Sequence, residues 1–144
     1  MDINKKLFIM RNLFAGLQAE TIARYAKGGI LNEIEKERME LSLASGEKNA
    51  KILEVTEPVE AITIPASIVD CASWEVTRNK DGLIAVCEGC KLAAMCKKIG
   101  TPSPCRMYCL NAIEGMIKVL KPEAVFIVKS TLWSEENCTV EVAW

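Results

Sequence analysis

Five of the seven cysteines of this 144-residue chain lie between Cys87 and Cys109, in the spacing C-x2-C-x5-C-x8-C-x3-C. The other two, Cys71 and Cys138, lie outside this segment. Thiolates ligate zinc and iron–sulfur clusters, and they are also the reactive form of cysteine in redox chemistry. The chain contains no histidine, which excludes a serine-type triad and mixed Cys/His metal sites.

The cysteine spacing predicts two pairs that converge. Cys87 and Cys90 flank Glu-Gly where a strand is expected to end and a helix to begin, and a helix N-terminus favours thiolates. Cys105 and Cys109 are four residues apart at the start of the next predicted helix, so they share one helical face. If the two helices pack together, these four cysteines suit a tetrahedral zinc site. Exchanging one of them for Cys96 suits an iron–sulfur cluster.

Two other interpretations of the cysteines stay open. Free cysteines behave as small apolar residues that favour protein cores, and both Cys96 and Cys109 have apolar neighbours in the sequence. The thiols could also be redox-active without a metal. A thioredoxin-like C-x2-C site is a further option, but the flanking βαβ pattern that accompanies it is missing.

The first half of the chain, residues 1–73, is predicted to be mainly helical. Apolar residues recur at helical spacing from Ile3 onward, and Gly28 and Gly29 end this helix. Residues 57–73 are interpreted as a helix kinked at Pro65, although their β-branched residues also suit a strand. The expected helices span residues 3–26, 30–44, 48–55 and 57–73.

The second half, residues 74–144, is predicted to alternate hairpins and helices. Asp81-Gly82 is a strong turn signal between two short strands, WEVTR and LIAVC. Helices are expected at residues 91–99 and 105–120, and Pro122 ends the second of them. A final hairpin pairs residues 124–133 with 138–144. The whole chain is therefore expected to be a single α+β domain in which helices pack on a small antiparallel sheet of two hairpins.

Composition excludes several classes of protein. Eighteen basic and nineteen acidic residues nearly cancel, so the positive surface that nucleic-acid binding needs is not expected. The charged first residues do not resemble a signal peptide, and no apolar stretch is long enough to span a membrane. Cysteine-rich chains without an export signal favour a reducing compartment, which predicts a cytoplasmic protein.

The residues from Trp74 to Trp144 resemble a known family. Their runs KLAAMCKKIG, CRMYCLNAIEGM and STLWSEENC are similar to the L-2-amino-thiazoline-4-carboxylate hydrolase family and the related 4-vinyl-reductase (hydrocarbon-binding) domains. The resemblance implies an α+β fold like that of TRAPP subunits, commonly a homodimer. It also implies small apolar ligands and, in some members, a structural zinc, for which Cys105 and Cys138 match two ligand positions.

These observations predict a small-molecule-binding or sensor module with a cysteine-ligated zinc or iron–sulfur site. The alternatives are a metal- or thiol-dependent hydrolase of a small thiazoline-type substrate and a structural subunit with free buried thiols, so whether the protein is an enzyme stays open. Its partners are expected to be a small apolar or sulfur-containing molecule and a second copy of the chain, bound through the apolar first helix. The metal-ligand candidates are Cys87, Cys90, Cys105, Cys109, Cys96 and Cys138, and the ligand-pocket candidates are Met116, Leu120, Phe126 and Val140.

Overall fold

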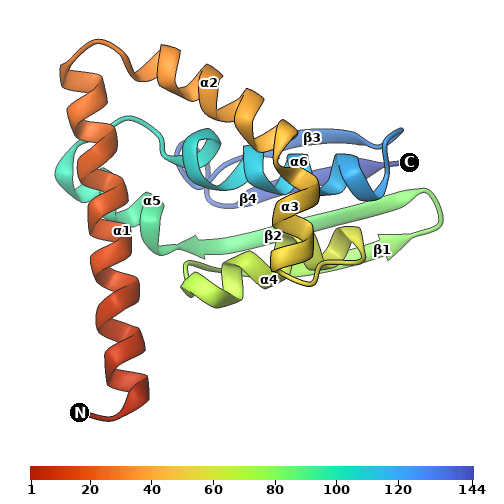
Figure 1. Cartoon of the computed structure of the whole chain (residues 1–144), viewed down its shortest axis with the longest axis horizontal. Helices are drawn as coiled ribbons and strands as arrows, with labels where there is room; N and C mark the ends of the chain where they lie inside the picture. Colours follow the sequence, from red (N-terminus) through yellow and green to blue (C-terminus); the bar gives the residue numbers. More distant parts are fainter.

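The computed structural model describes residues 1–144 and is an α+β fold with a four-stranded antiparallel sheet. The strand order is β1-β2-β4-β3 (Figure 1), so the two hairpins join through their β2 and β4 edges. This arrangement confirms the α+β class and the small sheet of two hairpins. The strands are β1 (Ala72–Asn79), β2 (Gly82–Cys90), β3 (Val125–Ser130) and β4 (Cys138–Ala143).

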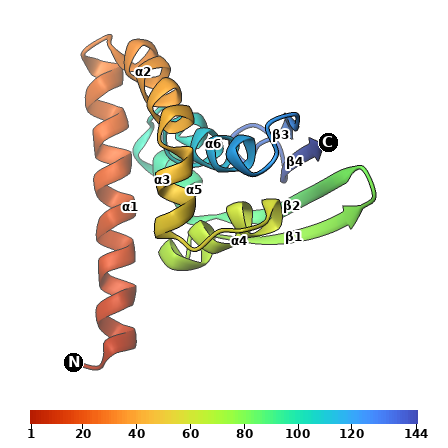
Figure 2. The same ribbon diagram turned by 45° about the vertical axis from the view of Figure 1, so that its right-hand side comes forward.

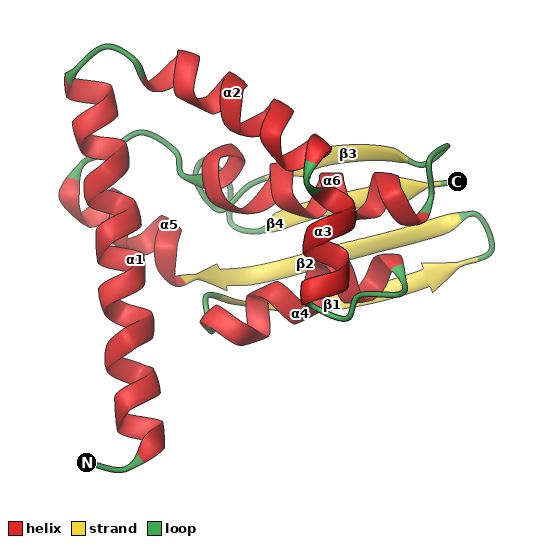
Figure 3. Cartoon of the chain, in the orientation of Figure 1, coloured by secondary structure: helices red, strands yellow, loops and turns green.

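Six α-helices and one π-helical turn make up most of the remaining chain (Figure 3). Four helices precede the sheet, and the other two lie between its hairpins. None of the helices is long and apolar enough to cross a membrane. The helical elements are α1 (Ile3–Lys27), α2 (Leu31–Ala44), α3 (Gly46–Ile52), α4 (Pro58–Val69), α5 (Lys91–Ile99), the π-helical turn η1 (Arg106–Leu110) and α6 (Asn111–Leu120).

The helices α3, α4 and α6 cover one face of the sheet. Residues alternate along β4, so Cys138, Val140 and Val142 are buried beneath the helices. The opposite face carries Ile84 and Ile127, which are exposed. The main hydrophobic core therefore lies between the sheet and α6, and a second, smaller core joins α1 and the start of α2 to α5 and η1.

Two glycines allow α6 to approach the end of α2 and the start of α3 at backbone contact. A Cβ built on Gly115 lies 2.2 Å from the Ser42 carbonyl oxygen, and one built on Gly46 lies 2.2 Å from the Gly115 carbonyl oxygen. Neither obstacle is a side chain that can rotate away. Any larger residue at either position therefore forces the helices apart.

Most predicted elements are present, and the differences have local causes. The helix at residues 58–69 keeps Pro65 in its interior, and Asp70 ends it in the left-handed conformation. Residues 131–133, predicted as strand, form a turn instead, in which the Ser134 and Glu135 N–H groups donate to the Thr131 carbonyl. The predicted helix at 105–120 begins as the π-helical turn η1, and the predicted third helix runs from 46 to 52 rather than from 48 to 55.

The first half of α1 extends beyond the rest of the chain (Figures 1 and 2). Its buried residues, Ala19 and Ile22, are both in the second half of the helix. Apolar side chains of the first half are exposed instead, among them Phe8 at 62%, Leu13 at 63% and Leu17 at 62%. This helix therefore presents a long apolar surface that nothing in the single chain covers.

Candidate functional site: a cluster of thiols beside an open cleft

All seven cysteines are free thiols, and chain segments that are far apart in sequence bring them to one end of the sheet. The first contribution comes from the pairing of β2 with β4, which places Cys87 opposite Cys138. Both residues are buried on the helix-covered face. Directly opposite residues of an antiparallel pair point to the same side, so these two thiols are cross-strand neighbours.

The β1–β2 hairpin brings a third and a fourth thiol to the same end of the sheet. Cys90 is the last residue of β2 and pairs with Ala72. The Lys91 N–H donates to the Cys71 carbonyl oxygen at 2.8 Å, which fixes Cys71 beside Cys90. The Ala93 N–H in the first turn of α5 donates to Cys90 Sγ at 3.4 Å, so Cys90 caps this helix. Both residues are half-buried.

The π-helical turn η1 supplies the remaining pair. Cys105 precedes η1 and Cys109 lies within it, and both pack against the main core. The Cys105 N–H donates to Ser103 Oγ at 3.3 Å, which fixes the start of this turn. The expectation that these two residues share one face of the element agrees with their common packing.

The pKa of Cys109 is influenced by four of the other thiols. Burial raises the pKa of Cys109 well above its usual value, and the neighbouring thiols of Cys71, Cys90, Cys138 and Cys105 act in the same direction. Burial also raises the pKa of Cys138 to about 12 and that of Cys71 to about 11. An apolar, thiol-rich surrounding disfavours the thiolates of Cys71, Cys109 and Cys138, because each charge would be poorly solvated and close to the others.

Cys90 is the member that connects the others. It acts on the pKa of all six remaining cysteines, including Cys96, which is fully buried in the second core beside α1. Cys96 is also close to the Thr101 hydroxyl, and it is absent from the thiols that act on Cys109. Cys96 therefore belongs to the second core, whereas Cys109 packs against the main core.

The donor types of this cluster suit a soft metal ion, because thiolates prefer zinc and iron–sulfur clusters. The side-chain positions do not form a prepared site, since no three Cys, Asp or Glu side chains are placed to hold a metal ion. Binding a metal would therefore require rotation of cysteine side chains. The metal-ligand set stays a prediction.

Trp74 carries a buried hydrogen-bond donor that has no partner. Trp74 pairs with Cys87 across β1 and β2, so the two side chains share the helix-covered face. Its indole Nε1–H is buried and has no hydrogen-bond acceptor. An unpaired buried donor costs about 1–3 kcal/mol.

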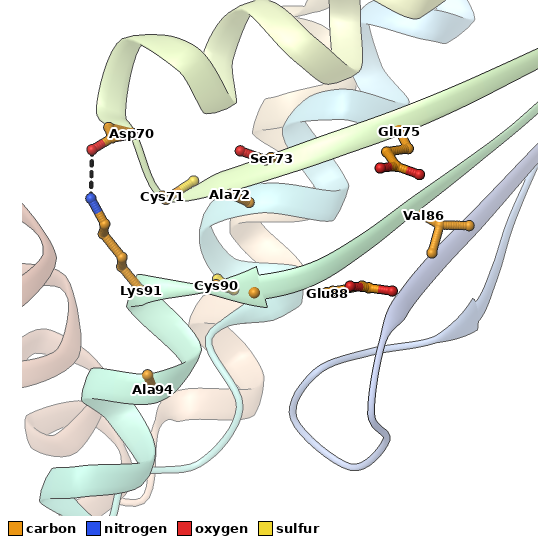
Figure 4. A pocket seen from close by; sticks show the side chains of 11 residues that line it. Asp70, Cys71, Ala72, Ser73, Glu75, Val86, Glu88, Cys90, Lys91 and Ala94 are labelled. Carbon is orange, nitrogen blue, oxygen red and sulfur yellow. Dashed lines mark hydrogen bonds and ion pairs between the residues drawn. The ribbon is translucent and has the colours of Figure 1, made fainter.

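An open cleft of about 550 Å³ borders the cluster (Figure 4). The start of β1, the end of β2 and the start of α5 form its walls. The thiol-bearing residues that line it are Cys71 and Cys90, and the carboxylates of Glu75 and Glu88 also line it. Solvent and small molecules therefore have a direct approach to this edge of the cluster.

An ion-pair group holds the walls of the cleft. Lys91 Nζ donates to Asp70 Oδ2 at 2.5 Å, and Figure 4 shows this bridge at the mouth of the cleft. The guanidinium of Arg11 on α1 lies 3.9 Å from the same carboxylate and donates through Nε to the Ile68 carbonyl at 3.0 Å. Three helices, α1, α4 and α5, are thereby fixed around Cys71.

The predicted ligand-pocket residues lie elsewhere. Met116 and Val140 are buried in the main core, while Leu120 and Phe126 pack against its edge. The open cleft does not include them. A pocket at these four residues stays a prediction.

Sequence reasoning treated Cys71 as an outlying cysteine, and the structure places it within the cluster. The signal was present in the predicted hairpin. Counting back from the turn pairs Asn79 with Gly82 and Trp74 with Cys87. The register then shifts by one extra residue in β2 between Trp74 and Ala72, which puts Ala72 opposite Cys90. The hairpin register thus carries Cys71 to the C-x2-C segment.

Comparison with known proteins gives no match. No family model, no curated protein and no solved structure is significantly similar to this chain. The likeness to the thiazoline-carboxylate hydrolase and hydrocarbon-binding families therefore stays a prediction from sequence.

Proposed function

We propose that this chain is a metal-binding sensor or small-molecule-binding module whose working part is the thiol cluster around Cys109. The observation that supports this most directly is the placement of thiols from separate segments of the fold. Cys138 lies opposite Cys87, the Lys91 N–H bond holds Cys71 beside Cys90, and Cys105 and Cys109 pack against the same core. None of them is in a disulfide. The ion would be zinc or the iron of an iron–sulfur cluster, because both take sulfur ligands.

The energetics of the buried thiols support the same proposal. Without a metal Cys109 and Cys138 stay protonated at neutral pH, because burial raises the pKa of both thiols. A bound cation reverses this preference, because ligating thiols lose their protons and their negative charges are then compensated. A reducing compartment, the cytoplasm, keeps the thiols available.

The open cleft supports the small-molecule part of the proposal. Its volume, about 550 Å³, is within the range of small-molecule sites. Cys71 and Cys90 line it, so a bound sulfur-containing molecule would lie next to the metal cluster. A homodimer formed through α1 is the assembly we propose, because the first half of that helix leaves its apolar side chains exposed.

Zinc titration of the reduced chain tests the proposal. Competition with a chromophoric chelator should give about one tightly bound zinc per chain. Cys109→Ala should abolish this binding, whereas Cys96→Ala should retain it, because Cys96 is buried in the second core and Cys109 packs against the main core. Cys96 is a core residue and Cys109 packs against the core, so melting curves check that each variant folds. Absence of binding in the wild-type chain, or equal loss in both variants, would contradict the proposal.

The second candidate function is hydrolysis of a small thiazoline-type ring. It is favoured by the cleft, which combines Cys90 at the N-terminus of α5 with the carboxylates of Glu75 and Glu88. A thiolate can act as the nucleophile of such a reaction. Because the chain has no histidine, a carboxylate would act as the general base. Turnover of a thiazoline carboxylate that Cys90→Ser abolishes would favour this candidate. If the chain shows neither turnover nor metal binding, the remaining interpretation is a structural subunit with free thiols.

A further inference from the structure

Cys71 and Cys90 are the thiol-bearing residues of the open cleft, and both are half-buried. Cys87 and Cys138, by comparison, are buried beneath the helices, and Cys96 is fully enclosed in the second core. Cys105 and Cys109 are half-buried but do not line the cleft. A small oxidant in solvent therefore meets the Cys71–Cys90 pair before the other thiols.

The backbone separation of the two residues suits a disulfide. Ala72 pairs with Cys90, and Cys71 is the residue before it, outside β1, so the strand's alternation of side chains does not fix the direction of Cys71. Cys71 and Cys90 both line the cleft (Figure 4). Adjacent strands lie about 4.8 Å apart and each residue advances about 3.3 Å, which gives a Cα–Cα distance of about 6 Å. Disulfides span Cα–Cα distances of about 4.4–6.8 Å. The Lys91 N–H to Cys71 carbonyl bond, at 2.8 Å, holds the two segments together.

The two thiols have different surroundings. Cys90 Sγ accepts the Ala93 N–H in the first turn of α5, where backbone dipoles stabilise negative charge. Cys71 instead follows the C-terminal end of α4, where the helix dipole disfavours negative charge. Cys90 is therefore the thiol that attacks first, and Cys71 is the one that reacts second.

We propose that hydrogen peroxide oxidises Cys90 and Cys71 to a disulfide, which makes this pair a modification site on the wall of the cleft. The Cys90 thiolate attacks one peroxide oxygen, so an S–O bond forms, the O–O bond breaks and the first water leaves. The Cys71 sulfur then attacks the resulting sulfenic acid, the S–S bond forms and the second water leaves. The two thiol protons end in the two waters, and the two electrons reduce the peroxide.

The new bond would join the end of α4 to the start of α5 and close the β1–β2 hairpin into a loop. It would also remove two thiols from the neighbourhood of Cys109. The oxidation itself does not depend on the proposed metal binding, since it needs only the two thiols and hydrogen peroxide. If the cluster does bind a metal, the disulfide makes that binding redox-dependent.

Peptide mapping of the reduced full-length chain tests this proposal in the presence of a chelator, so that failure to bind metal does not affect the result. After treatment with one equivalent of hydrogen peroxide and alkylation, the first disulfide should join Cys71 and Cys90, and five alkylated cysteines should remain of the seven. In Cys71→Ser, the sulfenic acid at Cys90 should accumulate and react with dimedone. Cys90→Ser should lose the disulfide and leave Cys71 reduced.

Cys105→Ser is the matched control, because Cys105 is equally half-buried but lies outside the cleft. This variant should form the Cys71–Cys90 disulfide at the wild-type rate. A first disulfide that joins any other two cysteines, or one between chains, would overturn the proposal. Dimedone labelling of Cys71→Ser at another cysteine before Cys90 would overturn it as well.

Discussion

Cys87 and Cys138 are direct partners across β2 and β4, with both side chains buried under the helices. They are 51 residues apart in sequence, so only the joining of the two hairpins makes them neighbours. This contact connects the C-x2-C segment to the last strand. The thiol cluster is therefore a product of the sheet topology as well as of the local cysteine spacing.

The raised thiol pKa values predict a loss of stability in alkali. A group whose pKa is higher in the folded than in the unfolded chain stabilises the fold fully below its unfolded pKa, about 8.5 for cysteine. This contribution is lost as pH rises toward the folded value, which is about 12 for Cys138. The unfolding midpoint in urea should therefore fall between about pH 8 and pH 10.

Cys138→Ala separates this effect from the titration of other groups. The variant should be less stable than the wild type at pH 7, because it loses a buried side chain, but its stability should fall less steeply between about pH 8 and pH 10. An identical pH slope in both proteins would show that the Cys138 thiol does not titrate differently on unfolding.

The ion pair at the mouth of the cleft predicts a second pH dependence. The hydrogen bond and charge of Lys91 lower the pKa of Asp70. A lowered carboxyl pKa stabilises the fold above the unfolded value, about 3.9, and this contribution is lost as pH falls through the folded value. Asp70→Asn should remove it while keeping the left-handed conformation that Asp70 adopts at φ 50°, because asparagine also tolerates that region.

Melting midpoints measured between about pH 3 and pH 7 check the Asp70 prediction. The wild type should lose more thermal stability toward acid than Asp70→Asn. Glu135→Gln is the control, since this exposed carboxylate lies in the loop before β4, and it should keep the wild-type acid dependence. Parallel curves for the wild type and Asp70→Asn would contradict the role given to the ion pair.

Backbone contact between helices predicts a strong effect at Gly115. A Cβ there lies 2.2 Å from the Ser42 carbonyl oxygen, so Gly115→Ala must displace α6 from α2. Overpacking of this kind costs about 1–3 kcal/mol. Gly16→Ala in α1 is the matched control, because its nearest obstacle is Met95 Sδ at 3.8 Å. It should stabilise the helix by about 0.5–1 kcal/mol. Chemical denaturation of both variants measures the difference, and a neutral Gly115→Ala would contradict the packing.

The exposed face of α1 predicts a dimer. Light scattering at micromolar concentration should give twice the mass of the chain, and Leu13→Lys together with Leu17→Lys should give a monomer that remains folded. Ile52→Lys is the control, since Ile52 in α3 is 66% exposed, close to the 62–63% of the two α1 residues, and it should leave the dimer intact. A monomeric wild type, or a dimer unaffected by the two lysines, would count against this assembly.

Local sequence signals predicted most of the fold. The Asp81-Gly82 turn, the glycines after residue 27 and the helical spacing from Ile3 gave the elements nearly to their ends. The turn at 131–133 was missed because Thr131, Leu132 and Trp133 have strand-like side chains, while the hydrogen bonds that form the turn are to the Thr131 carbonyl. Side-chain type does not report such backbone pairing.

The candidate site was only partly predictable for a similar reason. The C-x2-C and C-x3-C spacings identify Cys87, Cys90, Cys105 and Cys109 because these pairs are local. The positions of Cys71 and Cys138 depend on strand register and on which hairpin edges meet. Hairpin counting recovers Cys71, but no local pattern states that β2 pairs with β4.

Elemental analysis of protein purified and handled without oxygen tests the central claim most directly. The proposed function predicts about one zinc per chain, or iron and acid-labile sulfide with a visible absorption band. Cys109→Ala purified in parallel should have lost this content, and Cys96→Ala should have kept it. Wild-type protein that is free of zinc and iron, with all seven thiols titratable after unfolding, would contradict the claim and leave the cluster as buried thiols.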